Sequence, residues 1–122
     1  MEIIERTPTR LLALIDGDGQ ATPWFSVPDG ERRFSLSIRP VERQAQGLKT
    51  LYQQGASTLV WLERKRSHEQ DFEARRVQAF DFDTDLQGAE IMGEIDSFWQ
   101  LRLSVPTDGY TAGLWAMELS LS

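Results

Sequence analysis

The chain contains no cysteine and only one histidine in 122 residues. Without cysteine it cannot form disulfides, thiolate metal sites or a thiol nucleophile, which fits a reducing compartment. His68, which lies among Arg66, Ser67, Glu69 and Gln70, cannot make the usual zinc site without cysteine partners. No Gly-x-Ser-x-Gly sequence marks a nucleophilic serine, so we expect an exposed structural role for His68.

Long hydrophobic runs and nucleotide-binding motifs are also lacking. No run of about 18 apolar residues exists, and residues 1–6 have neither the basic start nor the apolar core of a signal peptide. No Gly-x-Gly-x-x-Gly sequence and no Walker loop is present. At this length the chain fits one domain. We therefore expect a single soluble domain over residues 1–122, cytoplasmic, with no membrane contact and no cofactor.

The charge is unevenly distributed along the chain. Residues 1–66 carry a balance of +2, whereas residues 67–122 carry −8, and the whole chain carries −6. An acidic second half argues against direct binding of nucleic acid, because phosphate contacts require a basic surface. It is compatible with docking to a basic protein surface, although surplus acid also serves simply to keep a small protein soluble.

The C-terminal segment has the clearest secondary-structure signal. Residues 97–105 alternate apolar and polar side chains, with Trp99 and Leu101 on one face and Phe98 and Gln100 on the other. This period of two predicts a strand with one dry face. A turn over 106–109 and a second strand over 110–121 follow, and apolar residues on both faces of the second strand predict cover on both sides.

Similar patterns occur in the rest of the chain. We predict further strands over 10–15, 22–27, 33–39, 57–63, 76–82 and 90–95. The strand at 57–63 has four consecutive apolar residues and should be central, while Gly93 marks a candidate bulge in the last of these strands. Seven or eight short strands at regular spacing predict a mainly β chain, an antiparallel β-sandwich of Ig-like or small barrel-like form.

One helix is expected within this β pattern. Val41, Ala45 and Leu48 recur at helical spacing, Pro40 suits a first helical turn, and Gly55 suits an end. We therefore predict a short amphipathic helix around residues 40–54. A long loop with one helical turn is the alternative, because a glycine in the middle of a helix costs about 1 kcal/mol relative to alanine.

Asp81, Asp83 and Asp85 alternate with Phe82 and Thr84, which would place the three carboxylates on one face. Such a group attracts a hard divalent cation. The segment does not match an EF-hand loop, because Leu86 and Met92 stand at the positions of the required glycine and glutamate. We expect a solvated strand edge, where like charges discourage edge-to-edge pairing, and no metal site.

Two sets of residues are candidates for binding a partner. The first is an acidic set in the second half of the chain: Asp81, Asp83, Asp85, Glu90, Glu94 and Asp96. The second is Trp24, which follows a proline near a turn and should be partly exposed, because tryptophan is enriched at the energetically important centres of protein interfaces.

The segment Asp108-Gly109-Tyr110, preceded by Val105-Pro106, resembles the tyrosine corner of immunoglobulin-like sandwiches, where a tyrosine entering a late strand bonds back to nearby backbone. The same ending is similar to that of Ig-like modules in tailed-phage baseplate and virion proteins. The helix predicted over 40–54 departs from an ordinary immunoglobulin domain. The resemblance implies a module of a virion or a similar assembly, so the expected location is cytoplasmic or virion-associated.

Two functions follow from these observations. The first is a non-enzymatic module that docks into a larger assembly, a phage virion or similar, and binds another protein or copies of itself as a homo-oligomer. The second is a small acidic inhibitor, such as an immunity or anti-defence protein, whose carboxylates block a basic site on a partner. Strong salt dependence of binding would favour the second.

Overall fold

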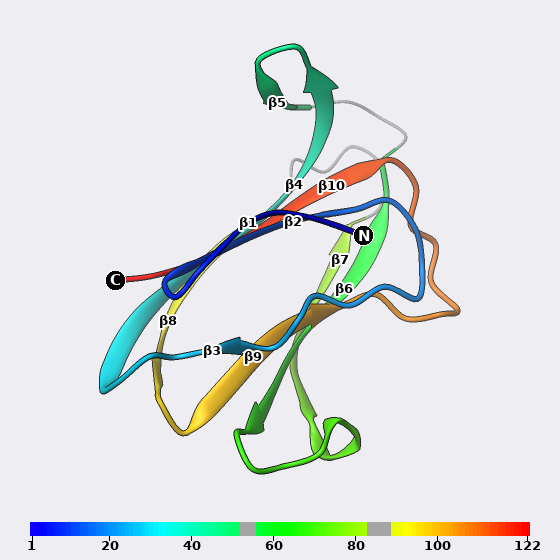
Figure 1. Cartoon of the computed structure of the whole chain (residues 1–122). Helices are drawn as coiled ribbons and strands as arrows, with labels where there is room; N and C mark the ends of the chain where they lie inside the picture. The colour runs from blue at the N-terminus through cyan, green and yellow to red at the C-terminus, as the bar shows by residue number, and fades with distance from the viewer. Residues whose placement is uncertain (52–55, 83–88) are drawn as a thin grey trace.

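The chain folds into two antiparallel sheets that face each other across one hydrophobic core (Figure 1). The structure is a computed structural model and describes residues 1–51, 56–82 and 89–122. It confirms the expectation of a mainly β chain arranged as a β-sandwich.

Sheet A contains β1 (Glu2–Thr7), β2 (Arg10–Ile15), β4 (Glu31–Gln44), β5 (Gly47–Thr50), β8 (Ala89–Asp96) and β10 (Leu114–Leu121). Its order is β1-β2-β10-β4-β5, and β8 pairs with β4 beside β5. Sheet B contains β3 (Phe25–Ser26), β6 (Thr58–Arg66), β7 (Arg75–Phe82) and β9 (Trp99–Ser104), in the order β3-β9-β6-β7. A 3-10 turn, η1 (Asp71–Glu73), lies between β6 and β7.

The alternating residues predicted to be apolar do line the core. On β10, Trp115 is fully buried and Met117 is 1% exposed, while Leu101 and Leu103 of β9 face them from sheet B. The opposite face of β10 is also covered, because Ala116 is buried with Leu12, Leu14 and Val41 in a small second cluster. The prediction of cover on both faces of this strand is therefore confirmed.

The predicted helix around residues 40–54 is wrong in the part of it that the structure describes. Strand β4 runs straight through Pro40 and forms a hairpin with β5, and residues 52–54 lie outside the described part. Val41 and Leu48 pack beside each other from paired strands, so their spacing mimics a helix. Gly47, at φ 125°, pairs with Gln44 directly after the two-residue turn and begins β5 instead of interrupting a helix.

Pro40 is tolerated within β4 because its nitrogen, which carries no hydrogen, faces a position where no partner strand needs a donor. Its carbonyl accepts a hydrogen bond from Leu51 N at 2.8 Å, so its nitrogen points toward the same side of β4. On that side β8 pairs only as far as Ile38, and β5 begins to pair at Val41. The proline therefore lies between two partner strands, where no ladder bond is lost.

Strand β6 is central in sheet B, as predicted, and the strand expected from about residue 76 is β7. The candidate bulge at Gly93 is wrong, because β8 pairs with β4 without a register shift. Strand β1 was not predicted: most of its residues are exposed, so its sequence carries no dry face.

Candidate interaction surfaces

Two loops with exposed phenylalanines lie at the same end of the sandwich. Trp99, the first residue of β9, pairs with Arg66, the last residue of β6, so the β8–β9 turn and the β6–β7 connection leave the sheet together. They lie at the bottom of Figure 1. Phe72 is 86% exposed and Phe98 is 71% exposed. We call residues 67–74 together with 97–99 the aromatic end.

Several hydrogen bonds hold these loops in place. Asp96 Oδ1 accepts from Phe98 N at 3.0 Å, and Glu69 Oε1 accepts from Arg66 N at 2.7 Å. The bond from the Arg66 backbone lowers the pKa of Glu69. The ring of Trp99 carries two guanidinium groups, with Arg64 Cζ at 4.4 Å and Arg66 Cζ at 5.1 Å from its centroid.

Trp24 is half-buried on the outer face of sheet B, which agrees with the partial exposure predicted from the sequence. Its ring lies 4.5 Å from Arg102 Cζ and 5.1 Å from Lys65 Nζ, and its Nε1 donates to Asp71 Oδ1 at 2.9 Å. These contacts are all within the chain. They give Trp24 a structural role in fixing residues 20–27 against sheet B.

Two charged side chains are buried beneath this segment. Glu63 is 7% exposed and accepts from Arg102 Nε at 3.0 Å, while Lys65 is 6% exposed and donates to the Glu69 carbonyl at 2.9 Å. A buried charge is costly unless it is paired. Each of these charges has a structural partner, which accounts for their burial.

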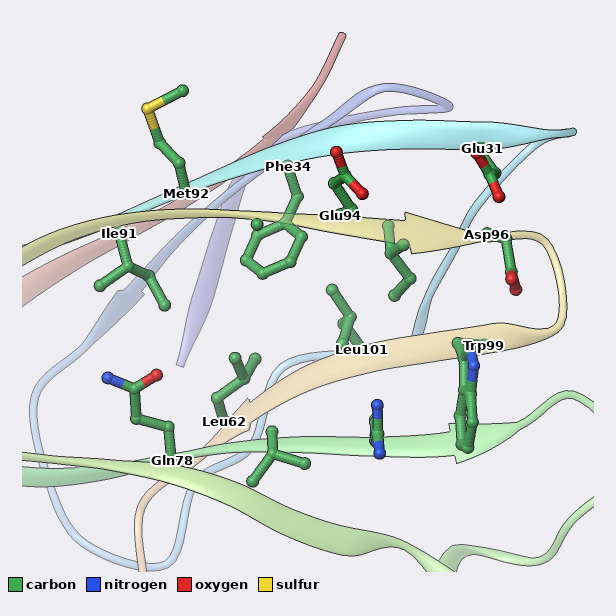
Figure 2. Close-up of a pocket in the computed structure, with 14 residues that line it drawn as sticks. Glu31, Phe34, Leu62, Gln78, Ile91, Met92, Glu94, Asp96, Trp99 and Leu101 are labelled. Atoms are coloured by element: carbon green, nitrogen blue, oxygen red, sulfur yellow. The ribbon is translucent and has the colours of Figure 1, made fainter.

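A cavity of about 550 Å³ lies between β8 and sheet B. Figure 2 shows Phe34 and Ile91 pointing into it from sheet A, toward Leu62 and Leu101 of sheet B. Gln78 adds an amide to the same lining. Its lining mixes apolar and polar side chains in similar proportion, and its size is typical of sites that accept a ligand or a partner's side chains.

The cavity also contains one cation and a group of carboxylates. Arg64 lines it, and Arg64 Nε is buried without a hydrogen-bond partner in the described part of the chain. Glu31, Glu94 and Asp96 belong to the lining as well. Glu31 pairs directly opposite Asp96, so two like charges stand side by side where the sheet edge ends.

The predicted acidic residues are divided between the two sheets. Asp81 is exposed on β7, on the face opposite the buried Phe80 and Phe82, as expected from the alternation. Glu90, Glu94 and Asp96 come together along β8 in sheet A. Asp83 and Asp85 lie outside the described residues.

His68 is exposed, in agreement with the expectation from the sequence. Within the ranges that the structure describes, no group of three or more histidine, aspartate or glutamate side chains is arranged to hold a metal ion. In those same ranges no helix has the length and apolar character needed to cross a membrane.

Tyr110 differs from the tyrosine corner that its sequence context resembles. Its side chain is 43% exposed, and its backbone carbonyl, not its hydroxyl, accepts the bond from Ser57 Oγ at 2.9 Å. Ser57 and Ala112 form an isolated bridge beside it. This segment is therefore tied to sheet B through its main chain.

Three residues that matter for these surfaces were not singled out from the sequence. Phe98 had a usable signal, because it is an apolar residue on the otherwise polar side of its strand pattern. Phe72 and Arg64 had none, since their positions depend on loop conformation and on the approach of β8. Comparisons with protein-family models, curated proteins and solved structures found no match to this chain.

Proposed function

We propose that this protein is a non-enzymatic interaction module that docks into a larger protein assembly through its aromatic end. The observation that carries the proposal is the exposure of Phe72 and Phe98 on adjacent loops. Large apolar side chains on ordered loops provide contact area at low entropic cost, and aromatic residues are enriched at the centres of interfaces.

The surroundings of the two phenylalanines support this role. The neighbouring Trp99 is stacked by Arg64 and Arg66, and hydrogen bonds fix both loops. A preordered surface loses little conformational freedom on binding. Aromatic anchors surrounded by arginine and acidic groups match the apolar centre and polar rim of an ordinary protein interface.

The finer form of the proposal is an Ig-like module of a phage virion or a similar assembly, located in the cytoplasm or on the virion. Its support is the sandwich architecture together with the strand, turn and final strand over residues 99–121. The tyrosine corner is not part of this support, because Tyr110 is bonded through its carbonyl. The partner is another protein or further copies of this chain.

The alternative function, an acidic inhibitor of a basic partner, has narrower support. Glu90, Glu94 and Asp96 lie on one strand, but Asp81 belongs to the other sheet. A phosphate-mimicking surface would therefore rest on β8 rather than on all the acidic residues of the second half of the chain.

The test is affinity purification of the tagged chain from its native cells, followed by mass spectrometry. We expect several structural proteins in fixed ratio with the wild type, and at least about tenfold lower recovery with the double variant Phe72→Ser, Phe98→Ser. The double variant Ile4→Ser, Tyr110→Ser, which removes two exposed apolar residues elsewhere, is the matched control and should recover the same proteins.

Two results would count against this function. Equal recovery by the phenylalanine variant would remove the aromatic end from the interaction. A single basic enzyme recovered at one-to-one stoichiometry and released by higher salt would establish the inhibitor instead.

A further inference from the structure

Strand β8 has an open edge. It pairs with β4 along its full length, and in the part of the chain that the structure describes it pairs with no strand on its other side. Strand β7 pairs with β6 alone within the same ranges. The 550 Å³ cavity lies between β8 and sheet B, so the sandwich formed by the described residues is open on this side (Figure 2).

The cavity lies where the inward side chains of one more strand would go. A strand added to β8 would run about 4.8 Å from it in the plane of sheet A. Its alternate side chains would point toward Leu62, Val77 and Gln78 of sheet B, beside Ile91. The volume far exceeds the roughly 30 Å³ of one water molecule, so several side chains can enter.

The charges on the outward face of β8 determine which side chains are favoured on the added strand, which we call the guest strand. Glu90 and Glu94 are exposed there, with Met92 between them at 70% exposure. None of the ion pairs among the described residues uses either glutamate. Side chains directly across a strand pair interact, so lysine or arginine on the outward face of the guest would be favoured.

A second copy of this chain is a poor guest by the same reasoning. Antiparallel pairing of β8 with another β8 would bring the glutamates of one copy close to those of the other, and like charges across a pair are destabilising. Exposed charges on an edge strand ordinarily prevent such self-association. A basic partner turns the same charges into attraction.

We propose that the open edge of β8 accepts an extended segment of a partner protein as an extra strand of sheet A, with apolar side chains filling the cavity and basic side chains facing Glu90 and Glu94. This is recognition by β-strand addition, in which main-chain bonds supply affinity and alternate side chains supply specificity. The inference rests on the proposed function only in that the chain binds another protein. It uses the edge of β8 and the cavity, which meet the aromatic end at Trp99 alone.

The test is selection of a displayed library of random twelve-residue linear peptides on the intact protein. The enriched peptides should alternate apolar and basic residues. A synthetic peptide of the enriched sequence should slow amide hydrogen exchange of β8 at least tenfold, and its dissociation constant should rise at least tenfold between low and high salt.

Charge reversal provides the matched comparison. The double variant Glu90→Lys, Glu94→Lys should lose binding of that peptide by at least tenfold. The double variant Glu42→Lys, Asp108→Lys makes the same change in net charge at exposed positions away from β8 and should bind it as the wild type does.

Three outcomes would overturn the inference: no enrichment, enriched peptides without alternation, or equal binding by the Glu90 and Glu94 variant. A dimer of the protein alone with protected β8 amides would assign the edge to a second copy and also overturn it. Recovery of the native assembly unchanged by the β8 variant would refute this inference while leaving the proposed function standing. If the wild-type chain recovered no assembly proteins in the affinity purification, the proposed function would be refuted, and the inference about β8 would be unaffected.

Discussion

Gly93 shows how one residue shapes the cavity wall. The ring of Phe34 lies across β8 at this position, and a Cβ built on Gly93 would stand 2.6 Å from two carbons of that ring. Phe34 and Gly93 are also direct partners in the β4–β8 pair. The glycine is therefore needed for close approach of an aromatic ring and not for a bulge or an unusual φ.

We predict that Gly93→Ala destabilises the fold by about 1–3 kcal/mol, because the new methyl group forces the ring of Phe34 out of its place. The free energy of unfolding in urea, followed by tryptophan fluorescence, measures this. Gly17→Ala is the control, since its nearest heavy atom would be 3.9 Å away and its φ is not positive. It should change stability by less than about 0.5 kcal/mol. Equal effects of the two substitutions would contradict the role of Phe34.

At the scale of elements, the central strands of sheet A are connected by ion pairs between side chains as well as by backbone hydrogen bonds. Glu118 of β10 accepts from Arg10 of β2 at 2.6 Å and 3.1 Å, and from Arg39 of β4 at 3.2 Å. Arg10 also pairs with Glu5 of β1 at 2.7 Å. One carboxylate on the central strand thus connects both of its neighbours.

This network makes stability depend on pH. Burial alone would raise the pKa of Glu118, but hydrogen bonds from Arg10 and Arg39 and the charges of both outweigh it, so the pKa is lowered from 4.5. A folded-state pKa below the unfolded one means that the stabilisation is present above pH 4.5 and is lost as the pH falls through the folded value.

We therefore expect Glu118→Gln to lower the free energy of unfolding by about 1–2 kcal/mol at pH 7. The difference from the wild type should shrink as the pH falls below 4.5 and through the folded-state pKa of Glu118. Urea unfolding at a series of descending pH values, down to the acid limit of the fold, measures this. Glu42→Gln, an exposed carboxylate on β4, should have little effect at any of these pH values. A deficit of constant size over the whole series would show that the charge of Glu118 does not matter.

For the whole molecule, the path of the chain is dominated by contacts between distant segments. Strand β10, at the C-terminus, lies between β2 and β4 from the first third of the chain. Strand β9 likewise pairs with β3 and β6. Neither sheet is complete until segments far apart in sequence have met, which carries a large loop-closure cost before contacts form.

We predict slow folding, in milliseconds to seconds, as is typical of β-sandwiches. Stopped-flow dilution from urea, followed by the fluorescence of the four tryptophans, among which Trp115 is fully buried, measures the rate. A chain ending at residue 113, which lacks β10, should not fold. Folding in microseconds, or a cooperative transition of the shortened chain, would contradict this account.

Much of the fold could be predicted from the sequence, because strands with one dry face leave a period of two. The strands around Leu101, Leu36 and Phe80 were found in this way. The wrong helix and the missed strand also have physical reasons. Val41 and Leu48 are neighbours across a hairpin but have the spacing of a helix, and β1 has no buried face to reveal it.

The candidate surfaces were less predictable, because they depend on which segments meet. The sequence placed Glu90, Glu94 and Asp96 among the binding candidates, but not the open edge on which they lie. Asp81 is similar in sequence context, yet it belongs to the other sheet. The partial exposure of Trp24 was expected, whereas its contacts with Lys65, Arg102 and Asp71 were not.

Composition and local pattern were enough to establish a mainly β chain, its acidic second half and most strand positions, because alternation and net charge are properties of neighbouring residues. The tertiary structure alone decided the strand order and the position of the cavity beside β8. It also decided the burial of Glu63 and Lys65 and brought Phe72 and Phe98 to the same end of the sandwich. Each of these depends on side chains from distant parts of the chain occupying the same space, and no local pattern records that.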